Sequence, residues 1–199
     1  MMQSVRAGRR SSGWIVAALM LAMTGWVLGA TDLPNVALKK TATASASEDG
    51  HPPEHAVDGD QETRWCYSDG TTGAWWQVDL GTAQALGGCE IKWEHDGAVY
   101  QYVVEGSTDG KKWIVLNDQR GSKEPTQAQK LLLAGDASRY VRITVTGLED
   151  GSWASFFEVK LMDAASMKKL TADEAKSYHV SAPVKAATTA PATAPATAK

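Results

Sequence analysis

Strict alternation of apolar and polar residues is the feature that most constrains the fold of this chain. Within residues 75–80 apolar side chains occupy every second position from Trp76 on, and residues 140–145 repeat the pattern from Val141 on. A period of two sends successive side chains to opposite faces of an extended strand. Both segments are therefore predicted to be half-buried β-strands.

A β-hairpin is predicted between residues 100–107 and 112–116, because Asp109-Gly110 lies between them and Asp-Gly is a strong signal for a tight turn. Further strands are expected at residues 90–94, 130–133 and 156–161. No stretch of the body has a clear helical period, although residues 54–58 suit one helical turn. Short strands separated by turns indicate an all-β, antiparallel sandwich or barrel. The tryptophans in strand patterns are expected in its core: Trp65, Trp75, Trp76, Trp93 and Trp113.

The composition divides the chain into four parts. Residues 1–30 place basic residues before an uncharged apolar run, the pattern of a signal peptide, with an uncleaved N-terminal anchor as the alternative. The β-rich body covers residues 33–163. Residues 164–180 are rich in good helix formers and predict a short helical segment. Residues 181–199 are mostly Ala, Thr and Pro and are expected to form a disordered tail.

Charge and motifs argue against several classes of function. The net charge is −3 and no basic cluster occurs in the body, so a nucleic-acid partner is not expected. Membrane insertion beyond the N-terminal segment is not expected either. His51 and His55 have the spacing of two helical zinc ligands, but the prolines between them disfavour a helix. No nucleophile elbow or phosphate-binding loop is visible, so the chain is not expected to be an enzyme.

The turn at residues 56–65 concentrates oxygen ligands. Asp58, Asp60 and Thr63 supply carboxylate and hydroxyl oxygens, and Gly59 permits a tight bend. Ca²⁺ accepts six to eight such oxygens in flexible geometry, so the turn is a candidate calcium loop. The alternative is a polar turn whose side chains bond their own backbone.

The chain contains two cysteines, Cys66 and Cys89. An exported protein meets an oxidising environment, which favours a disulfide between them. Two buried, reduced thiols are the alternative.

Several motifs together resemble a known family. They are His55-Ala56-Val57-Asp58-Gly59-Asp60, then Thr63-Arg64-Trp65, then residues 75–81, 104–110 and 139–143, and finally Phe157-Glu158-Val159. They are similar to coagulation-factor type C (discoidin) domains, which include the family 32 carbohydrate-binding modules. The resemblance spans nearly all of the body and implies a galactose-binding-like jelly-roll β-sandwich of about eight strands.

The resemblance also implies a structural calcium ion. Its side-chain ligands would be Asp58, Thr63 and Glu158. Backbone carbonyls of His55, Asp60 and Phe157 would complete the set. Glu158 is expected to reach the turn if the first and last strands pair.

The function that the resemblance implies is carbohydrate binding, and the N-terminal segment predicts that the module is secreted, periplasmic or envelope-associated. Sugar sites combine an aromatic face with a few hydrogen-bonding groups. The candidate ligand-binding residues expected on loops are Glu48, Tyr67, Glu94, His95 and Trp153. Galactose-binding relatives often use His and Arg near the positions of Cys66 and Glu94, so the usual galactose site is not expected here. A glycan or glycoconjugate is the expected partner, and a protein partner in an envelope or extracellular complex is the alternative.

Overall fold

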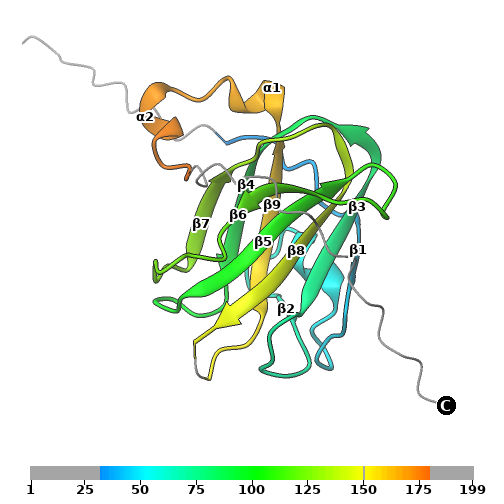
Figure 1. Ribbon diagram of the computed structural model, residues 1–199, viewed down its shortest axis with the longest axis vertical. Helices are drawn as coiled ribbons and strands as arrows, with labels where there is room; N and C mark the ends of the chain where they lie inside the picture. Colours follow the sequence, from blue (N-terminus) through cyan, green and yellow to red (C-terminus); the bar gives the residue numbers. More distant parts are fainter. Residues whose placement is uncertain (1–31, 150, 180–199) are drawn as a thin grey trace, which may run out of the picture. The chain divides into compact units, whose positions relative to one another are not determined.

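The computed structural model describes residues 32–149 and 151–179, where nine antiparallel strands form two sheets packed face to face (Figure 1). One sheet has the order β1-β3-β8-β5-β6, with strands Thr41–Ala44, Trp75–Gln84, Ser138–Leu148, Tyr100–Ser107 and Ile114–Asp118. The other has the order β2-β9-β4-β7, with strands Trp65–Cys66, Ser155–Asp163, Leu86–Trp93 and Ala128–Leu132. The predicted β-sandwich is confirmed. The strand number exceeds the expected eight because two-residue β2 pairs with β9.

The alternating segments behave as predicted. Trp76 and Val78 of β3 point inward with no exposed surface, and they pair with Ile143 and Val141 of β8. The predicted hairpin joins β5 to β6, and the side chains of its turn residues bond the turn backbone. In contrast to the expectation, β1 pairs with β3 and not with the last strand.

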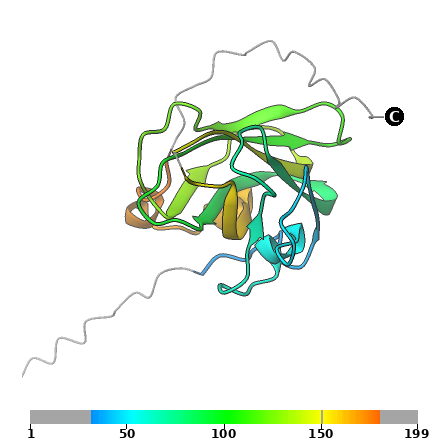
Figure 2. The same ribbon diagram turned by 90° about the horizontal axis from the view of Figure 1, so that it is seen from below.

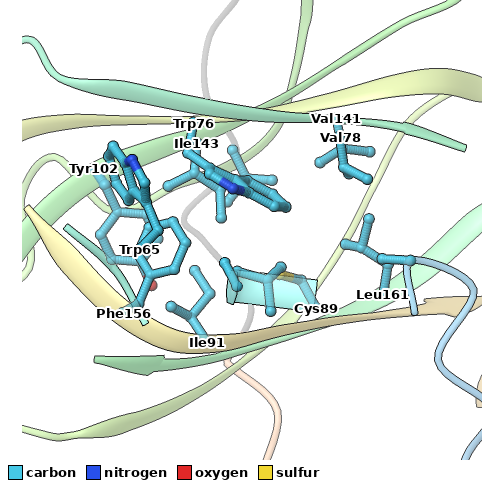
Figure 3. Packing of buried hydrophobic residues seen from close by; sticks show 14 of the residues in the cluster. Trp65, Trp76, Val78, Cys89, Ile91, Tyr102, Val141, Ile143, Phe156 and Leu161 are labelled. Atoms are coloured by element: carbon cyan, nitrogen blue, oxygen red, sulfur yellow. The ribbon is translucent and has the colours of Figure 1, made fainter. Parts of the chain in front are cut away.

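Phe156 occupies the centre of the aromatic core, between the two sheets (Figure 3). Its ring centroid lies 4.9 Å from that of Trp65, 5.6 Å from that of Trp76 and 5.5 Å from that of Trp93. All four rings are fully buried. Because these residues come from β2, β3, β4 and β9, one cluster joins both sheets.

Trp75 and Trp113 do not belong to this core, which corrects the prediction for them. Trp75 alternates with inward-facing Trp76 and so lies on the outer face of the five-stranded sheet. The guanidinium of Arg142 lies 4.7 Å from the Trp75 ring centroid and 4.1 Å from that of Trp113. Both indoles are half-buried by this stacking rather than by the other sheet.

Helical structure is limited to short segments. A 3₁₀ turn, η1, covers Pro53–Val57, close to the expected turn. The segment predicted to be helical holds two one-turn helices, α1 at Ala164–Met167 and α2 at Ala172–Ala175. Beyond them the Tyr178 hydroxyl donates to Glu90, and His179 pairs with Leu131 of β7. Within residues 32–149 and 151–179, no helix is long and apolar enough to cross a membrane.

The predicted signal or anchor at residues 1–30 and the predicted tail at 181–199 lie outside the described residues.

The predicted disulfide is absent: Cys66 and Cys89 are both free and buried. Cys66 pairs with Ser155 of β9, and Cys89 pairs with Leu161 of the same strand. At about 3.3 Å per residue, those two positions on β9 are about 20 Å apart. Bridged cysteines need Cα atoms within about 7 Å, so this fold cannot join the two thiols.

Four connections cross between the sheets at one end of the sandwich, which we call the loop end (bottom of Figure 1; Figure 2). They are residues 67–74, 149–154, 94–99 and 119–127 in spatial order, because β2, β9, β4 and β7 lie opposite β3, β8, β5 and β6. The segment between β1 and η1 also reaches this end. The fold therefore places loops that are distant in sequence next to each other.

Candidate functional site

An ion pair between Arg64 and Glu94 lies at the loop end. Arg64 immediately precedes β2 and Glu94 immediately follows β4, and both strands flank β9. The Arg64 Nε lies 3.0 Å from Glu94 Oε1, without the alignment of a hydrogen bond. The other Glu94 oxygen lies 3.9 Å from His95 Nε2. The pair is half-buried, so parts of both side chains, with donor and acceptor atoms, remain open to solvent.

Glu48 approaches the same site from the loop after β1. Its backbone N–H donates to the Cys66 carbonyl at 2.9 Å, and the Cys66 N–H donates to the His51 carbonyl at 3.4 Å. These bonds hold the loop against the end of β2. The Glu48 carboxylate lies 3.9 Å from the His51 imidazole.

The Cys66 thiol beneath this loop is a poor nucleophile. Its pKa is raised to about 11, chiefly by burial and in part by the nearby Glu48 and Glu94 carboxylates. Since the thiolate is the reactive form, the thiol stays neutral and unreactive near pH 7.

Two aromatic side chains flank the polar groups. Tyr67 follows β2, its N–H donates to the Ala154 carbonyl at 2.9 Å, and its ring packs against the core. Trp153 is half-buried and lies against Gly70, where an added Cβ would be 3.5 Å from the indole nitrogen. Trp153 is therefore the better candidate for an aromatic face open to a ligand.

The structure thus places the five candidate ligand-binding residues, Glu48, Tyr67, Glu94, His95 and Trp153, on loops at one end. It also adds Arg64, which the sequence reasoning overlooked. Its position between Thr63 and buried Trp65 was a usable signal, because alternation directs Arg64 away from the core.

Described residues line hollows at two places relevant to the candidate sites. One of about 440 Å³ lies beside Glu158 and is lined in part by Leu33, Asn35, Leu38 and Lys160. The other, of about 230 Å³, lies at the loop end between Val99, Ser122 and Glu149.

The predicted calcium loop is compact. Asp58 accepts hydrogen bonds from the Asp60 N–H and from the Thr63 hydroxyl, both at 2.8 Å. Gly59 has φ +86°, and its N–H donates to Glu158 at 3.3 Å. The structure therefore brings Glu158 to this loop, although through packing of β9 against η1 and not through the pairing that was expected.

Glu158 is a buried carboxylate beside a second one. Its exposure is 3%, and burial raises its pKa to about 7, with the negative charge of Asp58 adding to the rise. A divalent cation between these carboxylates would offset both effects, since it stabilises their charged forms. The residues present therefore fit a calcium ion.

The remaining ligands would have to come from a hydroxyl and the backbone. No group of three or more His, Cys, Asp or Glu side chains that could hold a metal occurs in the described part of the chain. The predicted ligand set does not need a third such side chain. Its two carboxylates are supplemented by the Thr63 hydroxyl and by backbone carbonyls of His55, Asp60 and Phe157. Phe157 lies beyond the last β2–β9 pair, at Phe156, so β2 does not cover its backbone.

Comparison with known proteins relates the body of the chain to one family. The model of the F5/8 type C domain matches residues 41–159. The polysaccharide lyase 8 family protein HylA of Enterococcus faecalis is 25% identical over 175 residues, which cover 81% of this chain and 12% of that protein. The chain thus corresponds to a small part of that relative.

Three solved structures share the fold over nearly their whole length. The CpGH89CBM32-4 module of Clostridium perfringens has a TM-score of 0.58 at 24% identity, covering 65% of this chain and 99% of that one. Chitosan-binding module 1 of a Paenibacillus chitosanase/glucanase has a TM-score of 0.57 at 25% identity, covering 64% and 98%. The CBM32 of AlyQ, solved with 4,5-unsaturated mannuronic acid, has a TM-score of 0.54 at 26% identity, covering 62% and 95%.

The metal-free protein is expected to lose stability as pH rises from about 4.5 to about 7. The folded-state pKa of Glu158 is raised above its ordinary value of 4.5, so the folded protein holds this proton more tightly than the unfolded chain does. The stabilisation is complete at low pH and is lost through that window, with a size of about 1–3 kcal/mol. Urea unfolding in chelator should show this fall for the wild type and not for Glu158→Gln. Identical pH profiles for the two proteins would contradict it.

Proposed function

The chain belongs to the F5/8 type C domain family, and from this premise we propose that it is a non-catalytic carbohydrate-binding module with its glycan site at the loop end. The observation that carries the proposal is that the half-buried Trp153 and the Arg64–Glu94 pair lie on neighbouring connections of the loop end. An aromatic face stacks on the C–H groups of a sugar ring. Charged donors and acceptors at fixed positions orient its hydroxyls through strong hydrogen bonds.

The nature of the sugar follows from the charge of this end. Arg64 neutralises Glu94, while Glu48 and Asp96 add further negative charge. The relatives differ in ligand, since one is named a chitosan-binding module and another was solved with an unsaturated mannuronic acid. Electrostatic complementarity favours a neutral or amino sugar over an acidic one here.

The groups at this end suit binding better than catalysis. The Cys66 thiol is buried with a raised pKa, and Glu94 is held by Arg64. A nucleophile next to an activating base, or two carboxylates flanking an open site, would be needed for hydrolysis. Binding a sugar requires neither of these arrangements.

A protein-interaction module is the second candidate function. The observation that favours it is the half-buried aromatic surface formed by Trp75, Trp113 and Tyr140 on the outer face of the five-stranded sheet. Glycan binding at the loop end does not use this surface, so the two candidates predict different sensitive residues.

Replacing Trp153 with alanine is expected to weaken glycan binding by about 1–3 kcal/mol, the usual loss for an aromatic anchor. Affinity for a hit from a glycan array should be measured by calorimetry, with the melting temperature as a check on folding. Trp113→Ala is the matched control, because it removes another half-buried indole away from the loop end. If Trp113→Ala weakens binding and Trp153→Ala does not, the site lies on the sheet face. Failure of the wild type to bind any glycan would favour the protein-interaction function.

The second part of the proposal is a structural calcium ion held by Asp58, Thr63 and Glu158 with backbone carbonyls of His55, Asp60 and Phe157. Its support is the like-charged pair formed by buried Glu158 and half-buried Asp58. When bound, the ion would supply positive charge that keeps Glu158 ionised. Extracellular calcium modules bind at about 10⁻⁴–10⁻³ M, so weak affinity would suffice for the exported module predicted from residues 1–30.

Added calcium is expected to raise the melting temperature of chelator-treated protein by several degrees, because ligand that binds only the folded state stabilises it. Asp58→Asn should abolish the rise, whereas Asp69→Asn, in the exposed loop after β2, should retain it. Differential scanning calorimetry with calcium and with chelator measures both. Equal melting temperatures under the two conditions would refute the site.

A further inference from the structure

The loop end carries a second hollow that the candidate site does not use. Its volume is about 230 Å³, and its lining includes Val99, Gln101, Ser122, Lys123, Leu148 and Glu149. Pockets for drug-sized ligands typically hold about 300–1,000 Å³. This groove is therefore too small for an oligosaccharide and suits one residue of a longer chain.

The groove shares two of its loops with the candidate site. The β4–β5 connection begins with Glu94 and His95, and Val99 near its other end lines the groove. The β8–β9 connection begins with Glu149 of the groove and reaches Trp153 of the site, turning through a bond from the Ser152 N–H to the Glu149 carbonyl. Neighbouring strands are about 4.8 Å apart, so adjacent connections lie within reach of successive sugar residues.

The walls of the groove are fixed by contacts that need no ligand. Val99 pairs with Pro125, which holds the β6–β7 connection against the β4–β5 connection. The Gln101 side-chain amide donates to the Ser122 carbonyl at 3.3 Å. Gly147 gives Gln101 its space, because a Cβ at that position would lie 2.2 Å from Gln101 Oε1. A groove shaped in advance loses less free energy when it orders around a ligand.

On these grounds we propose that the groove is a second sugar subsite, so that the loop end binds a chain of at least two sugar residues; the inference rests on the proposed function. The first ring stacks on Trp153, and the next residue places its hydroxyls between Lys123 and Glu149. These side chains have opposite charges, which suits an uncharged ring whose hydroxyls both donate and accept. No aromatic side chain lines the groove, so it adds affinity only to a glycan already held at Trp153.

Chain-length dependence of binding tests the subsite. Calorimetry should compare glucosamine with chitobiose and chitotriose, and N-acetylglucosamine with GlcNAc-α-1,4-galactose, together with mono- to trisaccharides of any array hit. For the series that binds, the wild type should hold the longer sugars about tenfold more tightly than the monosaccharide, as expected for added hydrogen bonds to charged groups. Lys123→Ala/Glu149→Ala should remove that advantage and leave monosaccharide affinity unchanged. Glu124→Gln, next to Lys123 but outside the groove lining, is the matched control.

The outcomes separate this inference from the proposed function. Equal affinity for mono- and oligosaccharides, or an advantage that survives the double substitution in a variant of normal melting temperature, would overturn the subsite and leave the Trp153 site standing. Lack of binding to every sugar would overturn both.

Discussion

The structure depends on the contact of Phe156 with three tryptophans. Its ring lies within 5.6 Å of Trp65, Trp76 and Trp93, counted between centroids, and joins strands from both sheets. Truncating such a residue typically costs about 3–5 kcal/mol. The neighbours of Phe156 on β9 extend this anchor to the loops. Ser155 pairs with Cys66 and its hydroxyl donates to the Trp65 carbonyl, which fixes the exit of β2 toward the candidate site. Glu158, two residues after Phe156, contacts the loop that contains Asp58.

One strand therefore positions the two proposed sites, which differ in chemistry. Its N-terminal end adjoins Trp153 and the loop end, while its middle presents a buried carboxylate to the loop proposed to bind calcium. A calcium ion at Glu158 would stabilise the strand that organises the sugar site without contacting the sugar. With an ion bound there, this arrangement would let the metal affect binding while being structural in role.

Much of the fold could be predicted, because alternation and turn chemistry are local. The pattern at Trp76 and Val78 determines which face of β3 is buried, and Asp109-Gly110 determines the hairpin. The partners of each strand could not be derived this way. Trp75 has the residue type of a core position, but a period of two cannot tell which outer residues stack on an arginine of the next strand. The predicted disulfide was wrong for a related reason. An oxidising compartment and the presence of two cysteines do not reveal that Cys66 and Cys89 pair with distant positions along β9.

The candidate site shows the same division. Loop composition and family resemblance singled out Glu48, Tyr67, Glu94, His95 and Trp153, and the crossing connections place them at one end. Arg64 was missed because its partner Glu94 is thirty positions away, and only the placement of β2 and β4 on either side of β9 brings the pair together. Charge pairs that depend on strand order are not visible in a single sequence.

The central claim is that ligand binds at the loop end through the Arg64–Glu94 pair and Trp153. Backbone and indole NMR shifts during titration with a glycan hit test it most directly, because they locate the ligand without a substitution. The account predicts that the largest changes fall on Arg64, Glu94 and the Trp153 indole, with smaller ones on Lys123 and Glu149. Changes centred on Trp75, Trp113 and Arg142, with the loop-end signals unmoved, would contradict it.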